Sequence, residues 1–590
     1  MLVPTEAREI SVGTVEDLNN CARGVTSERG DICTVLAGTY DLSTLAGGSV
    51  RVLLEGVTIR SVAGPFVTIV RGSGLAPLIS IEADNVVVNG FLLSNSGQAP
   101  LIQVNDPTRR NVRIAGNLMT NLIGPFQDGV RFSATSLENV FLINNTIWRG
   151  TGHGVWFDSA MHDLSGVEIT DMRVLEMGQS GIRVQVSGDV SDFLVWSGLR
   201  CEFQRMGATG IDFSSVDTLD NIAIFGCTIR DNQGSGVSLH AVNDIREVIL
   251  LENQIEDNGQ AGVGFAAPKM STIRFLNNRI RGNQEGILLS AVKTIRQLML
   301  ISQELSLNRA SGLSVYCGEE LQQVQLSDNL FLRNREHGAF LRAQRLEGFS
   351  STDDRFEANG VHGLYFDLGR TVHGLKVERA EVIDHTFDEG ILGTGILLFA
   401  PEGGTQLLIR ASGFRGNQRA LYLESPLEFL SGVEMLELEI ESIQMGIGLV
   451  ALELLQKVTL KAIKISNSTT GALLKAREGS ALLLQDVQLE HNQVGLELAT
   501  TGTIVESVDF RNNAQGIVAQ RTDNIRVKDS NFEGNREFGV RVAEGLSGTL
   551  DARDNWWGAP TGPRHANNPQ GRGDAVSDRV QFDPFLTQPR

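Results

Sequence analysis

The amino-acid sequence predicts an all-β solenoid, in which short strands stack coil upon coil around one continuous core. Three observations support this prediction. A motif of the form Asn-x-φ-x-x-Asn followed by Gly-φ-x-φ, where φ is apolar, recurs throughout the chain. Its glycines return every 24 to 29 residues between Gly129 and Gly363. The residues after each glycine alternate between apolar and polar types, as at 181–186, which indicates strands rather than helices.

Each repeat has room for three short strands separated by Gly and Asn, which make one coil of a right-handed parallel β-helix. A single coil cannot bury its apolar side, so neighbouring coils must stack. Two clear copies of the motif begin at Asn253 and Asn278. An inward Asn side chain can hydrogen-bond to the backbone and to its equivalent in the next coil. We therefore predict a parallel β-helix over residues 31–550, with about 20 rungs spaced ~4.8 Å apart.

Composition and charge exclude several classes of function. The chain has 70 Asp and Glu against 51 Lys and Arg, and a net charge of −19. This balance argues against nucleic acid as a partner, because binding phosphates requires a basic surface. No apolar run reaches the ~18 residues of a membrane span. The first residues lack the basic and apolar segments of a signal peptide, so we expect a mature extracellular, cell-surface or periplasmic chain whose signal has been removed.

The N-terminal residues 1–30 are predicted to cap the first coil. Residues 14–24 form a short amphipathic pattern, with Thr14 as helix N-cap, Asp17 at the third helical position and Gly24 as a stop signal. An open solenoid end needs such a cover because its core and strand edges would otherwise be exposed.

The cysteines give two separate predictions. Cys21 and Cys33 are predicted to form a disulfide that pins the cap, which fits an oxidising compartment; the alternative is two buried free thiols. Cys201 and Cys227 are 26 residues apart at the same motif position, so they stack on adjacent rungs. We interpret this second pair as buried thiols that replace Asn. No metal site is expected there, because no other soft ligand shares that phase.

Two segments resemble known families. The segment Gly30-Asp31-Ile32 through Tyr40 resembles the first strands of the pectate-lyase-like β-helix superfamily. The segment Asp554-Asn555-Trp556-Trp557-Gly558, within a predicted C-terminal cap at 551–590, resembles the terminal segment of bacterial right-handed β-helix repeat proteins. The resemblance implies that the two Trp cover the end of the core; stacking on a sugar is the alternative. It specifies the fold strongly and the function weakly.

Phasing from each glycine gives the side chains that point outward on one strand face. Four consecutive rungs present Trp156 with Asp158, Arg183 with Gln185, Asp212 with Ser214, and Ser238 with His240. Paired carboxylates suit acid/base cleavage of a glycosidic bond, Trp156 could stack on a sugar and Arg183 could hold a uronate. Asp158 and Asp212 lie about 10 Å apart by rung count, slightly beyond the ~6.5–9.5 Å of inverting hydrolases. The alternative is an ordinary polar solenoid surface.

One run of residues is similar to the polygalacturonase motifs. Asp128-Gly129, His153-Gly154 and Arg183 follow in the same order, and the resemblance implies Asp128 as a carboxylate, His153 as a positioning group and Arg183 as a substrate contact. The chain departs from the pattern because Gly129 and Gln185 replace an Asp and a Lys. These fragments also share the phase of the repeat, which explains them without catalysis.

A second outward feature lies further along the chain. The outward positions predict an exposed apolar stripe that includes Tyr316, Phe340, Tyr365 and Tyr422, with an interruption at Gly448. Such a patch is typical of a ligand-binding or self-association surface. A 32-residue step from Gly363 to Gly395 indicates an insertion near residues 384–392, which could cover the stripe instead.

Two functions therefore stay open. One is a secreted or surface protein that binds, and could process, extracellular polysaccharide. The other is a non-enzymatic structural, adhesive or assembly protein that binds a protein partner or forms a homo-oligomer through the stripe. Incomplete signatures favour a non-catalytic role. No cofactor is expected; scattered Asp residues do not indicate a calcium ion or another metal.

Overall fold

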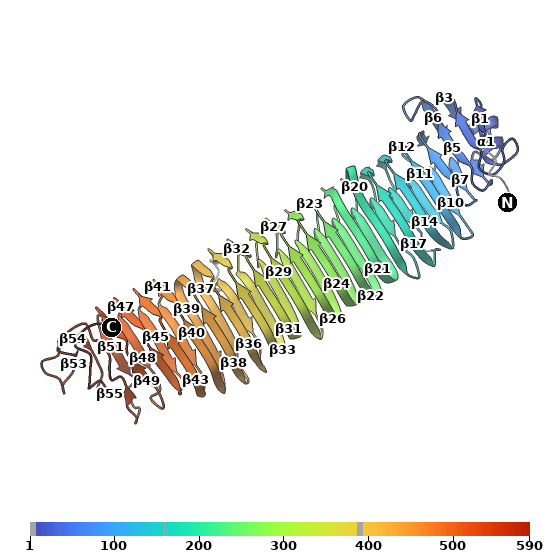
Figure 1. Ribbon diagram of the computed structural model, residues 1–590. Coiled ribbons are helices and arrows are strands. Elements are labelled where there is room, and N and C mark those ends of the chain that lie inside the picture. The colour runs from blue at the N-terminus through green and yellow to red at the C-terminus, as the bar shows by residue number, and fades with distance from the viewer. Residues whose placement is uncertain (1–6, 159, 386–392) are drawn as a thin grey trace. The chain divides into compact units, whose positions relative to one another are not determined.

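The computed structural model describes residues 7–158, 160–385 and 393–590. It confirms the predicted fold class, since the chain is an all-β parallel solenoid with one short helix. The coils number about 22, slightly more than predicted. Two compact units, residues 1–292 and 293–590, are described separately below. Within each unit the strands of successive coils lie side by side (Figure 1).

In the first unit, equivalent strands of successive coils pair in parallel and in register, with Val130, Val155, Ile182, Ile211 and Val237 aligned. These residues are buried and form part of the core. The repeated glycine permits the stacking, because a Cβ on Gly154 would lie 2.5 Å from the carbonyl oxygen of Gly181. The strands concerned are β13 (Val130–Ser133), β16 (Val155–Phe157), β19 (Ile182–Val184), β21 (Ile211–Arg230) and β22 (Val237–Leu251).

The second unit repeats this arrangement. Its aligned core residues include Leu313, Ala339, Leu364 and Ile396, all of them buried. The strands that carry its candidate site are β28 (Leu313–Cys317), β31 (Ala339–Thr352), β33 (His362–Glu378), β35 (Thr394–Phe399), β37 (Gly413–Ser425) and β39 (Glu439–Ala451).

The predicted asparagine ladder is present inside the coils. The backbone N–H and the side-chain amide of Asn232 both donate to Oδ1 of Asn258, at 3.3 and 2.9 Å. Asn258 makes the same two bonds to Asn283, at 3.0 and 2.9 Å. In the second unit His385 replaces one Asn, between Asn359 and Asn417. The ladder satisfies buried backbone donors that a purely apolar turn would leave without partners.

The predicted N-terminal helix is present with its capping residues. Helix α1 (Val15–Ala22) begins at Thr14, whose hydroxyl accepts the backbone N–H of Asp17 at 3.1 Å, while the Asp17 carboxylate accepts the N–H of Thr14 at 3.2 Å. Cys21 and Cys33 are joined by a disulfide, with their Cα atoms 6.1 Å apart.

The interpretation of the second cysteine pair is wrong. Cys201 and Cys227 form a disulfide between adjacent coils, where they pair in register. Their equivalent positions bring the Cα atoms to 4.7 Å, within the range that a disulfide can bridge. Because stacking already provides this approach, the same phase that suggested two thiols also permits their oxidation. Cys317 remains a buried free thiol.

The C-terminal segment closes the last coil through Trp557. Its side chain is fully buried and stacks on Phe532, with ring centroids 4.6 Å apart. Trp556 is also buried. A fully buried indole has no face available to a sugar, so Trp557 covers the core. The segment contains β52 (Leu550–Asp551), β53 (Pro563–Arg564), β54 (Gly573–Ala575) and β55 (Val580–Gln581).

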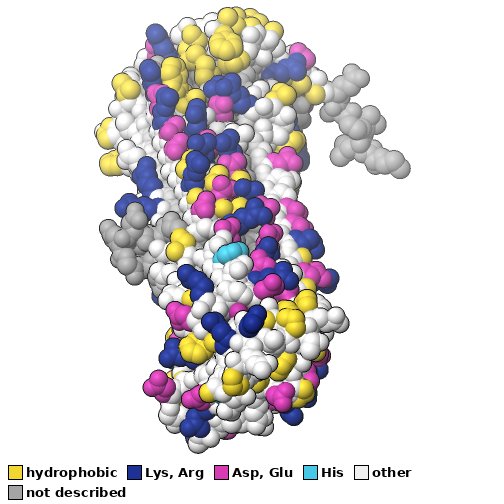
Figure 2. Space-filling view, turned by 90° about the vertical axis from the view of Figure 1, so that its left-hand side faces the viewer, with side chains coloured by type: hydrophobic (Ala, Val, Ile, Leu, Met, Phe, Trp, Pro, Cys, Tyr) yellow, Lys and Arg dark blue, Asp and Glu magenta, His cyan; other side chains and the backbone are white. Residues whose placement is uncertain are grey.

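Charged side chains of both signs are intermixed on the face that Figure 2 shows. Arg and acidic residues on neighbouring coils pair directly, as Arg379 does with Asp353 and Arg51 with Glu82. Such exposed pairs contribute little to stability one by one. Among the described helices, none is long and apolar enough to cross a membrane.

Candidate functional site

Asp128 and His153 occupy the position before the repeated glycine, where their side chains bind the backbone of the next coil. The N–H of His153 donates to Oδ1 of Asp128 at 2.8 Å, and the N–H of Ser180 donates to Nδ1 of His153 at 3.1 Å. Each side chain therefore accepts the backbone N–H of the equivalent residue one coil further along the chain. This ladder explains the resemblance of these fragments to polygalacturonase motifs as a requirement of the repeat.

Burial changes the proton affinities of these two groups in opposite senses. It raises the pKa of the Asp128 carboxyl to about 6, and the nearby Asp158 acts in the same direction. It lowers the pKa of His153 to about 4, assisted by the positive charge of Arg183. Both shifts disfavour the charged form, as desolvation does. At neutral pH, His153 is thus neutral and its Nδ1 is occupied as an acceptor.

Asp158 and Asp212 are both engaged by arginines of the same strand face. Arg131 donates through Nε to Asp158 at 3.0 Å, and Arg183 donates to Asp212 at 2.5 Å. Both residues were predicted to be outward-facing, but they are only 7% and 8% exposed, and each carboxylate is paired with an arginine. Burial raises the pKa of Asp212 more than Arg183 and His240 lower it.

The structure brings all the predicted residues of this region onto successive coils. Strand register aligns Arg131, Trp156, Arg183 and Asp212 in one row. The Arg131 guanidinium lies 4.0 Å from the centre of the Trp156 ring, and the His153 and Trp156 rings are 5.3 Å apart. We call this group the ion-pair face; it consists of Asp128, Arg131, His153, Trp156, Asp158, Arg183, Asp212 and His240.

Sequence reasoning missed Arg131, which binds Asp158 and stacks on Trp156. A signal was present, because Arg131 occupies the first outward position after Gly129, one coil before Trp156. Also missed was a groove of about 490 Å³ on another face of the first unit. Its apolar lining comes from outward positions of a different strand of each coil, which the glycine phase does not mark: Phe141, Leu194, Ala223, Phe225 and Ile249.

The predicted stripe forms a cluster of rings on adjacent coils of the second unit. Register aligns Phe340 with Tyr365, and Tyr316 with Arg342. The Tyr316 and Phe340 rings are 5.5 Å apart, and those of Phe340 and Tyr365 are 5.1 Å apart. Tyr316 is 37% exposed, but Phe340 is only 7% exposed, so its prediction as an exposed residue is wrong. The neighbouring rings bury it.

Two histidines border these rings at the position before the repeated glycine. The His337 and His362 rings stack, with centroids 5.2 Å apart, and both contact Tyr365. Nδ1 of His362 accepts the backbone N–H of Thr394 at 3.1 Å, as in the ladder of the first unit. Burial lowers the pKa of His337 to about 4 and that of His362 to about 3. Both rings are neutral at neutral pH.

Arg419 and Tyr422 extend the cluster on β37. The Arg419 guanidinium lies 4.6 Å from the centre of the Tyr422 ring, and its charge helps to lower the pKa of His362. Gly448 aligns with Tyr422 on the next coil, and a Cβ there would lie 2.5 Å from Cδ2 of Tyr422. The interruption of the stripe is therefore the space in which Tyr422 lies.

We call this second group the aromatic face. It consists of Tyr316, His337, Phe340, Arg342, His362, Tyr365, Asp367, Arg419 and Tyr422. The predicted covering segment, residues 384–392, lies largely outside the described residues, which end at 385 and resume at 393.

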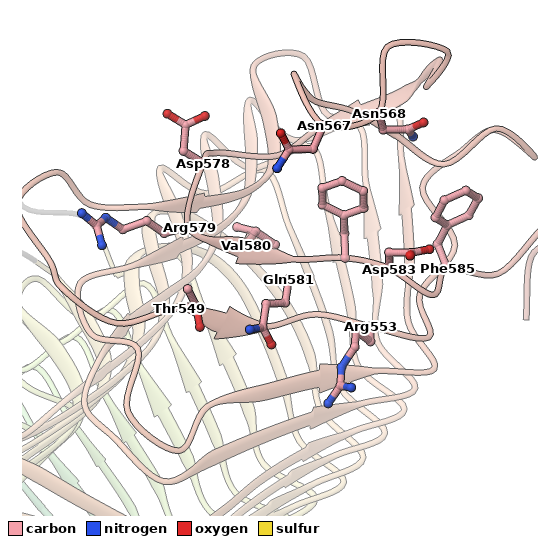
Figure 3. Close-up of a pocket in the computed structure, with 11 residues that line it drawn as sticks. Thr549, Arg553, Asn567, Asn568, Asp578, Arg579, Val580, Gln581, Asp583 and Phe585 are labelled. Atoms are coloured by element: carbon pink, nitrogen blue, oxygen red, sulfur yellow. The ribbon is translucent and has the colours of Figure 1, made fainter.

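A polar pocket of about 750 Å³ lies in the C-terminal segment, away from every predicted site residue in the sequence (Figure 3). Arg553, Arg579, Asp578 and Asp583 are among its lining residues. Over residues 7–158, 160–385 and 393–590, no group of three or more His, Cys, Asp or Glu side chains is arranged to hold a metal ion.

Solved structures similar to this chain are remote. The A-module of a mannuronan C-5 epimerase from Azotobacter vinelandii is 10% identical, with a TM-score of 0.22 over 97% of each chain. A PL6 family alginate lyase is 11% identical, with a TM-score of 0.30 over 93% of this chain and 100% of that one. The catalytic domain of a GH87 α-1,3-glucanase is 10% identical, with a TM-score of 0.24 over 60% of this chain and 66% of that one. The chain thus spans just under two thirds of the glucanase domain.

No curated protein matches the chain. The family model for a right-handed β-helix region matches residues 160–319, 200–382 and 429–555, which together exceed half of the chain. These segments coincide with the stacked coils described above. The chain therefore belongs to the family of proteins that contain a right-handed β-helix region.

Proposed function

We propose that this chain binds extracellular polysaccharide on the aromatic face. The observation that carries the proposal is the grouping of Tyr316, Tyr365 and Tyr422, three of the 4 tyrosines in the chain, on nearby coils. A sugar ring has an apolar face and polar edges, and Tyr offers the matching combination of ring and hydroxyl. Arg342 and Asp367, paired at 2.7 Å, supply polar groups beside the rings.

The ion-pair face does not present the pair of free carboxyl groups that cleavage requires. A glycosidase needs one carboxyl group to exchange a proton and a second to activate water or attack the sugar. Asp158 and Asp212 are each held by an arginine, and Asp128 accepts a backbone N–H in the ladder. These interactions occupy oxygens that a substrate would have to reach, even though burial raises the pKa of Asp128 and Asp212. The proposal therefore assigns this face a structural role.

The proposal includes a location in an oxidising compartment. The disulfides Cys21–Cys33 and Cys201–Cys227 both favour the cell exterior or the periplasm, because reducing compartments keep thiols free. Extracellular polysaccharides are the glycans that a protein would meet there.

Glycan binding to a Tyr365→Ala variant tests the proposal. Wild-type protein is screened on a glycan array, and the affinity for each bound glycan is measured by calorimetry. We expect Tyr365→Ala to weaken binding about tenfold, since losing one aromatic contact costs roughly 1.4 kcal/mol. Phe66→Ala is the control, because Phe66 is 82% exposed and belongs to the first unit, whereas the aromatic face belongs to the second.

Two results would contradict this function. Equal losses in Tyr365→Ala and Phe66→Ala would show that the aromatic face is not the site. Absence of binding to every glycan, together with concentration-dependent dimerisation that Tyr365→Glu abolishes, would establish the assembly function in its place.

A further inference from the structure

We propose that the polysaccharide carries an anionic sugar residue, whose carboxylate or sulfate is bound by Arg419 while its ring lies against Tyr422. This inference rests on the proposed function and names the class of ligand for the same face. Its argument begins with the surroundings of one guanidinium group.

Arg419 is a half-buried cation without a counterion among the described residues. Its Nε is buried and has no hydrogen-bond partner there, and no described carboxylate forms an ion pair with it. The neighbouring Tyr422 ring contacts the guanidinium from one side at 4.6 Å. Burial lowers the pKa of Arg419 more than Tyr422 and Glu424 raise it. Partial burial of a charge without a partner costs free energy that an incoming anion would offset.

Other partly buried arginines show what Arg419 lacks. The side chains of Arg131, Arg173 and Arg183 are 29 to 32% exposed, and each has a carboxylate partner. On the aromatic face itself, Arg342 pairs with Asp367. A bound anion would give Arg419 the partner that the protein supplies to these four.

The remaining groups of the face suit an uncharged part of the ligand. His337 and His362 are neutral at neutral pH, since their pKa values are about 4 and 3. They therefore add no positive charge to the face. Arg419 is left as the cation that selects an anion, next to rings that select a sugar.

Two kinds of sugar residue carry an anion that a guanidinium binds in the same way. A uronate offers a planar carboxylate, and a sulfated sugar offers a sulfate ester; both accept two parallel N–H donors from one arginine. The net charge of −19 repels polyanions at long range, so recognition must come from local contacts.

Matched pairs of polymers test the inference. Binding is measured by calorimetry for polygalacturonate against its fully methyl-esterified form, and for dextran sulfate against dextran. The proteins are wild type, Arg419→Gln, Arg419→Lys and the control Arg379→Gln, whose arginine pairs with Asp353 on an exposed edge at 2.7 Å. Thermal unfolding of each variant confirms that it is folded.

Wild type is expected to bind at least one anionic polymer about tenfold more tightly than its neutral counterpart. Arg419→Gln should remove this difference and leave the neutral polymer within about twofold, Arg419→Lys should keep part of it, and Arg379→Gln should keep all of it. The preferred polymer identifies the carboxylate or the sulfate as the anion.

Three results would overturn the inference. One is equal binding of neutral and anionic polymers by wild type; another is an equal loss on both in Arg419→Gln; the third is an equal loss in Arg379→Gln, which would indicate a general charge effect. Each of these leaves polysaccharide binding intact. If wild type binds none of the polymers and no glycan on the array, the proposed function fails with it.

Discussion

The ion-pair face and the aromatic face occupy the same phase of the repeat but differ in how their charges are balanced. Both have a ladder residue before the glycine and outward side chains after it. In the first unit, Arg131 and Arg183 are neutralised by Asp158 and Asp212. In the second, Arg342 is likewise paired with Asp367, but Arg419, which aligns with the ladder residues Thr394 and His362, has no such partner among the described residues. The same backbone pattern thus carries one face whose arginines are paired with carboxylates and one face with an unpaired arginine. Function therefore depends on the side chains rather than on the coil.

The largest effect that tests this comparison is expected for Arg183→Leu. This change leaves Asp212 buried without its partner, so the free energy of unfolding should fall by about 3–5 kcal/mol. Urea unfolding followed by Trp fluorescence measures it, since Trp156 and Trp196 report on the first unit. The double variant with Asp212→Leu should recover most of the loss. A loss below about 1 kcal/mol in the single variant would mean that the pair does not stabilise this face.

A smaller effect of opposite sign is expected for Asp128→Asn. Burial raises the folded-state pKa of Asp128 from 3.8 to about 6. Its stabilising contribution is therefore complete below pH 3.8 and is lost as the pH rises through 6. Asn can still accept the N–H of His153 but carries no charge, so the variant should be about 3 kcal/mol more stable at pH 8 and equal to wild type at about pH 3. Unfolding at both pH values measures this, and a gain that does not depend on pH would contradict it.

The smallest effect is expected for Arg419→Met without ligand. Removing an unpaired guanidinium relieves its desolvation, which offsets the lost contact with Tyr422. The free energy of unfolding should stay level or rise by about 1 kcal/mol, in contrast to Arg183→Leu. Thermal unfolding provides the measurement. A loss comparable to that of Arg183→Leu would place a counterion on Arg419 and remove the difference between the two faces.

The periodic parts of the structure were predictable from sequence because each depends on a residue type at a fixed phase. The glycine near each coil boundary, the Asn ladder and the capping box of Thr14 with Asp17 are such features. The Cys21–Cys33 bridge was also predicted, from two nearby cysteines in a cap.

The parts that escaped prediction depend on how side chains meet across coils. Phasing gives the direction of Asp158, but not the reach of Arg131 from the preceding coil that covers it. It gives the direction of Phe340, but not its burial by rings on either side. The groove lined by Phe141 and Leu194 lies on a different strand of each coil, whose outward positions cannot be assigned from the glycine motif. Alternation assigns a side to each residue, whereas exposure depends on the lateral neighbours.

The Cys201–Cys227 disulfide has a consequence for how the solenoid comes apart. A stacked array opens coil by coil from its ends, because each coil contacts only its neighbours. A covalent link between equivalent positions encloses one full coil of 26 residues and cannot open with the rest. Such a loop adds roughly 3–4 kcal/mol by the chain-entropy estimate. The bridge therefore acts as a stop against fraying within the first unit, and proteolysis from either side should halt at this coil until a reductant is added.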